Sequence, residues 1–335
     1  MKLISTTLAA LAIAVALVLS ACGGTDDAAN ESGGGETKLS LVAYSTPREA
    51  YEEIIPAFQK TEQGQGVSFD QSYGSSGEQS RAVEAGLPAD VVEFSLAPDI
   101  ERLVDAGLVA DDWADNEHKG MVTDSVVVLA VRKGNPKNIQ NWDDLLGDGV
   151  EVITPNPFTS GGARWNIMAA YGAQLEQGKS EQEAVEFLRQ LFSHVPVQDK
   201  SARESLQTFS GGKGDVLLAY ENEAIFAQQS GEELDYVVPD QTILIENPVA
   251  VTTEAPEQAQ AFVDFLLMPE AQKIFGEKGY RPVDEDALKT FDFPTPPNLF
   301  TIDDLGGWDT VGDTFFDRET GLMAEIEQEL GVPTD

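Results

Sequence analysis

The sequence has little of several residue types that carry chemistry. Its single cysteine, Cys22, excludes an intrachain disulfide. Its two histidines, His118 and His194, stand alone and far apart, so no metal site is expected. Lys and Arg number 21 against 58 Asp and Glu, which gives a formal net charge of -37. This charge argues against nucleic acid and anionic membrane surfaces as partners because both would be repelled.

Motifs that would indicate catalysis are also missing. The segment GGKGD (211–215) differs from a phosphate-binding loop because Gly214 follows Lys213 where Ser or Thr is required. The run GSSG (74–77) is not a nucleophile elbow, and the acidic run DEDALKTFD (284–292) lacks a calcium-loop pattern. We therefore expect no catalytic residue, no metal and no cofactor. An enzyme acting on a phosphate or sulfate ester is the less favoured alternative.

The first 37 residues have the composition of a targeting signal followed by a tether. Residues 1–21 are predicted to be a signal peptide, since Lys2 precedes an apolar run at 3–19. The string LSAC, which ends at Cys22, resembles a bacterial lipobox, in which the cysteine is acylated and the leader is cut before it. Residues 22–37 would then form a lipid-anchored flexible linker on the outer face of the cell membrane. The alternatives are a plain secretory leader with a chance cysteine and an uncleaved membrane helix.

From Lys38 onward the chain alternates strand and helix patterns, which is typical of a doubly wound α/β protein. Its length of 335 residues corresponds to one large or two medium domains. Pro47 stands at the first turn of a predicted helix with an apolar stripe from Tyr51 to Phe58. Ser180 and Glu183 have the spacing of a capping box at the start of another helix.

Segments in which a strand, a Gly/Ser turn and a helix follow one another recur along the chain. In VITPNPFTSGGARW (152–165), Ser160, Gly161 and Gly162 precede a helix that we expect to begin near Ala163. The first N–H groups of a helix have no partner within it, and glycines let an anion approach them. Three more strand-to-helix transitions have the same form: 67–77, 195–202 and 216–224. In an open α/β sheet such turns line up at the carboxyl edge, so four of them could converge on one small anion.

These segments carry a family resemblance. The strings concerned are YSTPREAY (44–51), YGSSGEQ (73–79), ADVVEFSLAPDIERL (89–103), VRKGNPKNIQNWDDL (131–145), VITPNPFTSGGARWN (152–166), GDVLLAYENEA (214–224) and LFTIDDLGGW (299–308). They resemble the periplasmic sulfate-binding and thiosulfate-binding proteins of ABC importers, in order and in spacing. The resemblance implies a two-lobe α/β clamshell in which each lobe is a doubly wound mixed sheet flanked by helices.

The resemblance also implies where the lobes divide. Lobe I would comprise residues 38–124 plus 250–335, and lobe II residues 125–249. The segments 125–132 and 243–253 would be the crossovers that form the hinge. Closure of the hinge would follow from a ligand that bridges both lobes.

In the relatives, sulfate lies dehydrated between the lobes and is held by neutral donors. The positions of this sequence that match are Ser76, Ser160, Gly161, Gly162, Ala202 and Tyr220. The resemblance implies backbone N–H groups from Ser76, Gly161, Gly162 and Ala202. The hydroxyl of Ser160 would add a donor, and that of Ser76 is a further candidate. The resemblance places Arg48 and Arg164 behind the ligand loops, where a surface ion pair is the alternative role.

Three positions depart from the family pattern. Tyr220 stands where many relatives have tryptophan, so a phenol would replace an indole N–H. Ser45 replaces an aspartate near the first-lobe loop, and Glu204 replaces a glycine near Ala202. Glu204 would repel sulfate if it pointed inward, and it would be harmless as a solvated carboxylate in the first turn of a helix.

A site that only donates hydrogen bonds favours sulfate, which at neutral pH carries no proton and accepts only. We therefore expect sulfate as the ligand, with thiosulfate as the close alternative and molybdate or phosphate as others. Affinity should be nearly flat from about pH 5 to 8. The protein is expected to be a monomer that delivers its ligand to the membrane permease of an ABC importer.

Overall fold

The computed structural model describes residues 37–332. The predicted signal peptide (1–21), the acylation site Cys22 and all of the linker before Thr37 lie outside the described residues. Within residues 37–332, no helix combines the length and the apolar character needed to cross a membrane.

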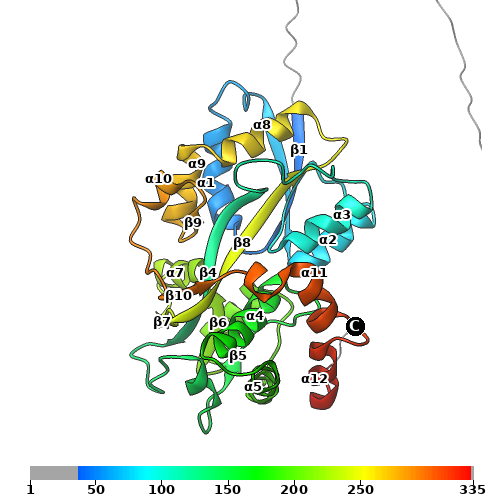
Figure 1. Cartoon of the computed structure of the whole chain (residues 1–335). Helices are drawn as coiled ribbons and strands as arrows, with labels where there is room; N and C mark the ends of the chain where they lie inside the picture. The colour runs from blue at the N-terminus through cyan, green and yellow to red at the C-terminus, as the bar shows by residue number, and fades with distance from the viewer. Residues whose placement is uncertain (1–36, 333–335) are drawn as a thin grey trace, which may run out of the picture. The chain divides into compact units, whose positions relative to one another are not determined.

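The strands form one mixed sheet with the order β2-β1-β3-β8-β4-β6-β5 (Figure 1). Three further strands join it, because β7 and β9 pair with β4 and β10 pairs with β8. Their bounds are β1 (Thr37–Tyr44), β2 (Val67–Gly74), β3 (Val91–Glu93), β4 (Met121–Arg132), β5 (Val152–Ile153), β6 (Val216–Tyr220), β7 (Leu234–Val237), β8 (Gln241–Val251), β9 (Arg281–Pro282) and β10 (Asn298–Phe300). Strands β1 and β2, β1 and β3, and β5 and β6 pair in parallel, whereas β4 and β8 pair antiparallel. Parallel pairs joined through helices are what the alternating sequence pattern predicts.

The helices flank this sheet. Their bounds are α1 (Arg48–Phe58), α2 (Ser76–Glu84), α3 (Ala97–Asp105), α4 (Gly161–Glu176), α5 (Glu181–Ser193), α6 (Ala202–Ser210), α7 (Glu221–Gln229), α8 (Glu257–Leu266), α9 (Pro269–Glu277), α10 (Glu285–Leu288), α11 (Gly307–Val311) and α12 (Leu322–Leu330). Short 3₁₀ helices lie at Trp142–Leu146 and Asp303–Leu305, and a π-helical turn at Gly312–Phe316.

The first lobe is built around β1, β2 and β3. Helix α1 buries the predicted stripe, and Tyr51 and Phe58 are nearly inaccessible. Both rings contact Phe262 of α8, with the centroids of Phe58 and Phe262 5.1 Å apart. The apolar face of α1 therefore joins the early strands to a helix that comes 200 residues later in the chain.

The second lobe contains β5, β6 and helices α4 to α7. Strand β6 is buried along its whole length, as expected for a strand covered on both faces. Helix α5 begins with the predicted capping box: Ser180 Oγ accepts a hydrogen bond from Glu183 N–H, and the Glu183 carboxylate accepts one from Ser180 N–H. The run 195–199, in contrast, forms only an isolated bridge, at Val197.

Strands β4 and β8 run through both the first and the second lobe. Strand β8 pairs with β3 at Val249–Val251 and with β4 at Leu244–Pro248, and β4 continues to pair with β6. Figure 1 shows these two long strands running from the neighbourhood of β1 to that of β6. The described chain thus has the two-lobe mixed α/β architecture that the sequence predicts. At the C-terminal end, α12 packs against α5, and Arg189 pairs with Glu325 and Glu329.

Candidate functional site

A small pocket forms where the N-termini of several helices from both lobes meet. It is lined by Tyr44, Ser45, Thr46, Ser75, Ser76, Ser95, Ser160, Gly161, Gly162, Ser201, Ala202 and Tyr220. All six residues that the sequence predicts as ligands line it, together with Ser45. Helices α1, α2, α4 and α6 begin at or next to these residues. The first N–H groups of each helix have no acceptor within the helix, so the pocket is rich in backbone donors.

Helix α4 brings the predicted Gly/Ser turn to this pocket. It begins at Gly161, two residues earlier than the sequence predicts, with Ser160 as its N-cap. Ser160 Oγ accepts from Ala163 N–H at 3.4 Å, which leaves the hydroxyl proton available to a ligand. A Cβ at Gly161 would lie 2.5 Å from Ser95 Oγ, whereas one at Gly162 would meet only ordinary contacts. Gly161 is therefore required for the two lobes to approach each other.

Helix α2 contributes Ser76 differently from the expectation. Its hydroxyl donates to Asp99 Oδ2 at 2.6 Å and accepts from Ser95 N–H at 3.0 Å. The hydroxyl proton is thus used within the protein. The expectation that the Ser76 side chain donates to a ligand therefore does not hold in this structure. The backbone N–H of Ser76 is still the first of α2, with Ser75 as N-cap.

Helix α6 settles the orientation of Glu204. Ser201 caps the helix by accepting from Glu204 N–H at 3.2 Å. The Glu204 carboxylate accepts from Lys200 N–H at 3.0 Å, is exposed and does not line the pocket. Ala202, the first residue of α6, lines it with its small side chain and its backbone.

Tyr220 lies at the end of β6 and precedes α7. Its hydroxyl and Ser95 Oγ are 2.7 Å apart, so the phenol forms a hydrogen bond across the pocket to the first lobe. Burial raises its pKa above the usual value, so the phenol keeps its proton at all ordinary pH values. Ser95 also accepts on its carbonyl from Trp165 Nε1 at 2.7 Å and from Asn247 at 3.1 Å. Ser95 is thus a point at which both lobes are joined.

No residue that lines the pocket carries a charged side chain. An ion-pair network next to Ala202 is centred on Arg203 of α6, which bonds Glu49 of α1 at 2.6 and 2.8 Å and Glu223 of α7 at 2.9 Å. Burial lowers the pKa of Arg203, but ion pairs with Glu223 and Glu49 more than offset this and raise it overall. The network sets one guanidinium between two carboxyl groups and links α6 of one lobe to α1 of the other.

The arginines expected behind the ligand loops lie outside the pocket lining. Arg48 is exposed and stacks on Tyr73, with its guanidinium 4.8 Å from the ring centroid. Arg164 donates to Pro157 O at 3.0 Å and lies 4.9 Å from the centroid of Phe316. Burial lowers the pKa of Arg164 to about 10, with Asp99 acting in the opposite direction, so it remains charged at neutral pH.

Several lining residues were not identified from the sequence. They are Tyr44, Thr46, Ser75, Ser95 and Ser201. Ser75 and Ser201 are the N-caps directly before predicted ligands, so the capping preference for serine could have found them. Ser95 follows a buried strand and precedes α3, which is the same strand-to-helix pattern. Tyr44 and Thr46 carry no such signal.

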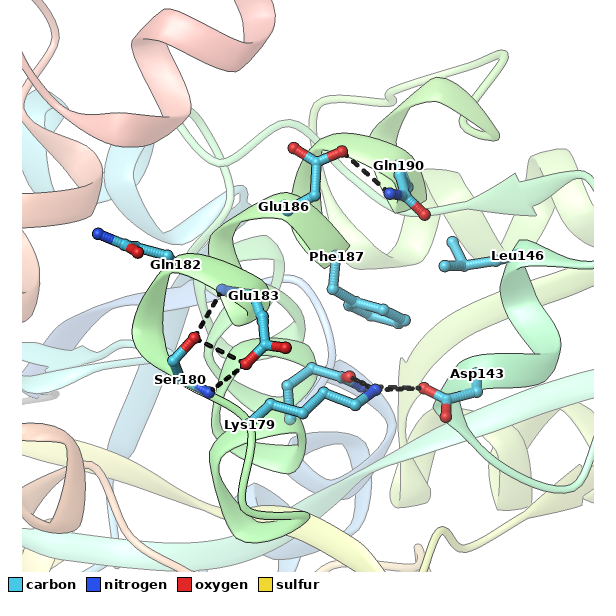
Figure 2. A pocket seen from close by; sticks show the side chains of 10 residues that line it. Asp143, Leu146, Lys179, Ser180, Gln182, Glu183, Glu186, Phe187 and Gln190 are labelled. Carbon is cyan, nitrogen blue, oxygen red and sulfur yellow. Dashed lines mark hydrogen bonds and ion pairs between the residues drawn. The ribbon is translucent and has the colours of Figure 1, made fainter.

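A larger surface hollow of about 680 Å³ lies beside α5 and has a different character (Figure 2). Its lining includes the carboxylates of Asp143, Glu183 and Glu186. Lys179 bonds Asp143 at 3.2 Å, and Glu183 is engaged with the backbone and hydroxyl of Ser180. Three carboxylates around one basic residue make this hollow unfavourable for an anion.

Comparison with known proteins agrees with this geometry. Residues 39–281 match the family described as bacterial extracellular solute-binding protein. The chain is 44% identical to the sulfate-binding protein of Synechococcus elongatus, over 96% of this chain and 95% of that protein. It is 38% identical to the thiosulfate-binding protein of Pseudomonas aeruginosa, over 83% of this chain and 89% of that one.

A solved structure is also similar. It is that of the sulfate-binding protein SubI from Mycobacterium tuberculosis, with 46% identity and a TM-score of 0.82. The similarity covers 84% of this chain and 100% of that chain. On the family match and on these relatives, the chain belongs to the bacterial extracellular solute-binding proteins.

Proposed function

We propose that the pocket binds sulfate and that the chain is the extracytoplasmic binding component of an ABC importer. The observation that carries the proposal is a pocket at converging helix N-termini that is lined by no charged side chain. The proposed ligands are the backbone N–H groups of Ser76, Gly161, Gly162 and Ala202 with the Ser160 hydroxyl; Tyr220 belongs to the same pocket. The names of the relatives support the same anion.

Local donors overcome the unfavourable overall charge in this proposal. The net charge of -37 is spread over a surface that salt screens within roughly 8 to 10 Å. Helix N-termini and hydroxyls act at contact in a dry site. Affinity therefore depends on the pocket and only weakly on the surface carboxylates.

Selectivity follows from the orientation of the surrounding carboxylates. Asp99 accepts from Ser76, and Glu78 accepts from Ser75 Oγ at 2.7 Å, so both are occupied by serines. Hydrogen phosphate would bring an O–H that needs an acceptor, which a donor-only site does not supply. Thiosulfate lacks such a proton as well and remains the alternative ligand, in keeping with a thiosulfate-binding relative.

We propose that ligand binding closes two lobes, residues 38–124 plus 250–335 and residues 125–249, about β4 and β8. Support comes from the pocket, because Ser76 and Ser95 line it from one side and Ser160 and Tyr220 from the other. The C-terminal residues from Phe300 to Ile326, which these bounds assign to the first lobe, share a hydrophobic core with α4 and α5, so we expect this segment to move with the second lobe. X-ray scattering with and without sulfate tests closure: the radius of gyration should fall on binding, and an unchanged value would contradict it.

The proposed setting of the protein rests on the sequence. A lipid anchor at Cys22 would hold a monomer on the outer face of the membrane, near the permease. The acidic composition disfavours nucleic acid as a partner. Labelling of expressed protein with a fatty-acid analogue, in parallel with a Cys22→Ser variant, tests the anchor; equal labelling of both would rule it out.

Calorimetric titration of the purified protein, dialysed free of oxyanions, tests the ligand. We expect micromolar or tighter sulfate binding that thiosulfate displaces and phosphate and molybdate do not. Absence of sulfate heat together with tight binding of a protonated or larger oxyanion would overturn sulfate as the ligand.

A further inference from the structure

The pocket contains one buried hydroxyl that the protein leaves without a partner. Tyr44, the last residue of β1, is 3% exposed, lines the pocket, and its Oη makes no hydrogen bond of normal geometry among the described residues. The hydroxyls of Thr46 and Tyr280 are its polar neighbours. A buried phenol without a partner is unfavourable, so it points to a group that arrives from outside the chain.

The other hydroxyls near it are engaged within the protein. Thr46 Oγ1 and Tyr280 Oη are 2.8 Å apart, and Tyr220 Oη is bonded to Ser95 Oγ. The Ser76 hydroxyl donates to a carboxylate. Among the described side chains that line the pocket, Tyr44 stands out as buried and unpaired.

The environment of Tyr44 keeps its proton in place. Burial raises its pKa well above the usual value, with further increases from Tyr280, Glu93 and Tyr220 and an opposing effect of Thr46. The phenol is therefore a neutral donor throughout the ordinary pH range. A neutral donor is the kind of group that an anion without protons requires.

We propose that the Tyr44 hydroxyl donates a hydrogen bond to the bound anion, while Tyr220 uses its hydroxyl to join the lobes through Ser95. This inference rests on the proposed function and adds a ligand to the same site. In many relatives the indole at this position would donate to the anion, whereas the Tyr220 phenol joins the two lobes through Ser95. The indole can only donate, whereas a phenol paired with a serine satisfies both partners.

The test compares three phenylalanine variants of the full-length protein by sulfate titration. Tyr44→Phe should weaken sulfate binding about 10- to 100-fold, as expected for a lost hydrogen bond to a charged group. Tyr73→Phe is the matched control, because its hydroxyl bonds Gln71 and it does not line the pocket; it should change affinity less than about threefold. Tyr220→Phe should accelerate release through the lost bond to Ser95, with a smaller loss of affinity than Tyr44→Phe.

A spectroscopic readout separates a direct contact from a structural effect. Sulfate should produce a tyrosine ultraviolet difference spectrum in the parent protein that is absent in Tyr44→Phe and kept in Tyr73→Phe. The unliganded Tyr44→Phe protein should unfold at the same or a higher temperature, because it loses an unpaired buried hydroxyl. Equal affinity of Tyr44→Phe and the parent would overturn the proposal.

Failure of the proposed function gives a distinct pattern. If the parent protein itself shows no sulfate binding but binds another oxyanion, sulfate is the wrong ligand, and the same variants are titrated with the anion that binds. Loss of affinity for that anion in Tyr44→Phe alone would support the role of Tyr44, and equal affinity would refute it.

Discussion

Helices α4 and α5 begin with the same residue type and offer different chemistry. Both have serine at the N-cap, and in both the serine oxygen accepts from the third helical N–H. In α5 the third residue is Glu183, whose carboxylate binds back to Ser180 and closes the capping box. In α4 the third residue is Ala163, preceded by Gly161 and Gly162, and the first turn carries no carboxylate.

The difference shows that a serine cap alone does not make an anion site. At α5 a carboxylate of the chain already occupies the positive end of the helix, and Glu181, Glu183 and Glu186 make the surroundings acidic. At α4 the end is open, and the termini of α2 and α6 lie beside it. An anion site needs free N–H donors, space and the termini of further helices.

Closing the N-terminus of α4 should abolish the difference between the two helices. Gly161→Asp places a Cβ 2.5 Å from Ser95 Oγ and adds a carboxylate among the donors, so we expect no measurable sulfate binding. Calorimetry checks the affinity. Gly312→Asp is the matched control, because a Cβ at Gly312 meets nothing within 4 Å, and it should bind like the parent. Binding by Gly161→Asp at parental affinity would place the anion elsewhere.

A smaller change removes only one hydroxyl from each cap. Ser160→Ala should weaken sulfate binding by about 1 to 3 kcal/mol through loss of a donor to a charged ligand. Ser180→Ala should leave affinity unchanged and lower the free energy of unfolding by about 0.5 to 2 kcal/mol, because only a helix cap is lost. Paired titrations and denaturant unfolding separate the two effects. Equal sulfate affinities of the two variants would remove Ser160 from the contacts.

This contrast also shows how far the sequence alone could lead. The capping box of α5 and the turn of α4 are local patterns, so both were predictable, and so was the apolar stripe of α1. The bond from Ser76 to Asp99 and the bond from Tyr220 to Ser95 join residues 23 and 125 positions apart, and their geometry depends on tertiary packing. Tyr44 became visible as an unpaired donor only when the partners of the Thr46, Tyr220 and Tyr280 hydroxyls were known.

The contact between the lobes can be weakened without changing a residue that lines the pocket. Glu49→Gln removes the charge that α1 offers to Arg203 but leaves the pair of Arg203 with Glu223 intact. Stopped-flow measurement should show sulfate release accelerated roughly 3- to 10-fold, because the closed form loses an ion pair between lobes. Glu325→Gln, which loosens the surface pair with Arg189, is the control and should release sulfate at the parental rate. An unchanged rate in Glu49→Gln would mean that this ion pair does not hold the lobes together.

The smallest expected effect is that of pH, because the pocket lining contains no group that titrates near neutrality. The closest candidate is Glu93 at the end of β3, which is buried and accepts from the Tyr51 hydroxyl. Burial raises its pKa to about 8, opposed by Tyr51, so it is neutral below that value. Sulfate affinity should therefore stay flat from about pH 5 to 8.

Above pH 8 the ionised carboxyl of Glu93 adds a negative charge near Tyr44, and the affinity should fall roughly two- to fivefold by pH 9. The same group makes the folded state bind a proton that the unfolded chain releases. Its contribution to stability is full below the unfolded-state pKa and is lost as the pH rises toward 8. Glu93→Gln should remove both dependences, as titrations and thermal unfolding at pH 5, 7 and 9 would show. A fall in affinity between pH 5 and 7 that persists in Glu93→Gln would contradict this prediction, because it would require a titrating group within the pocket.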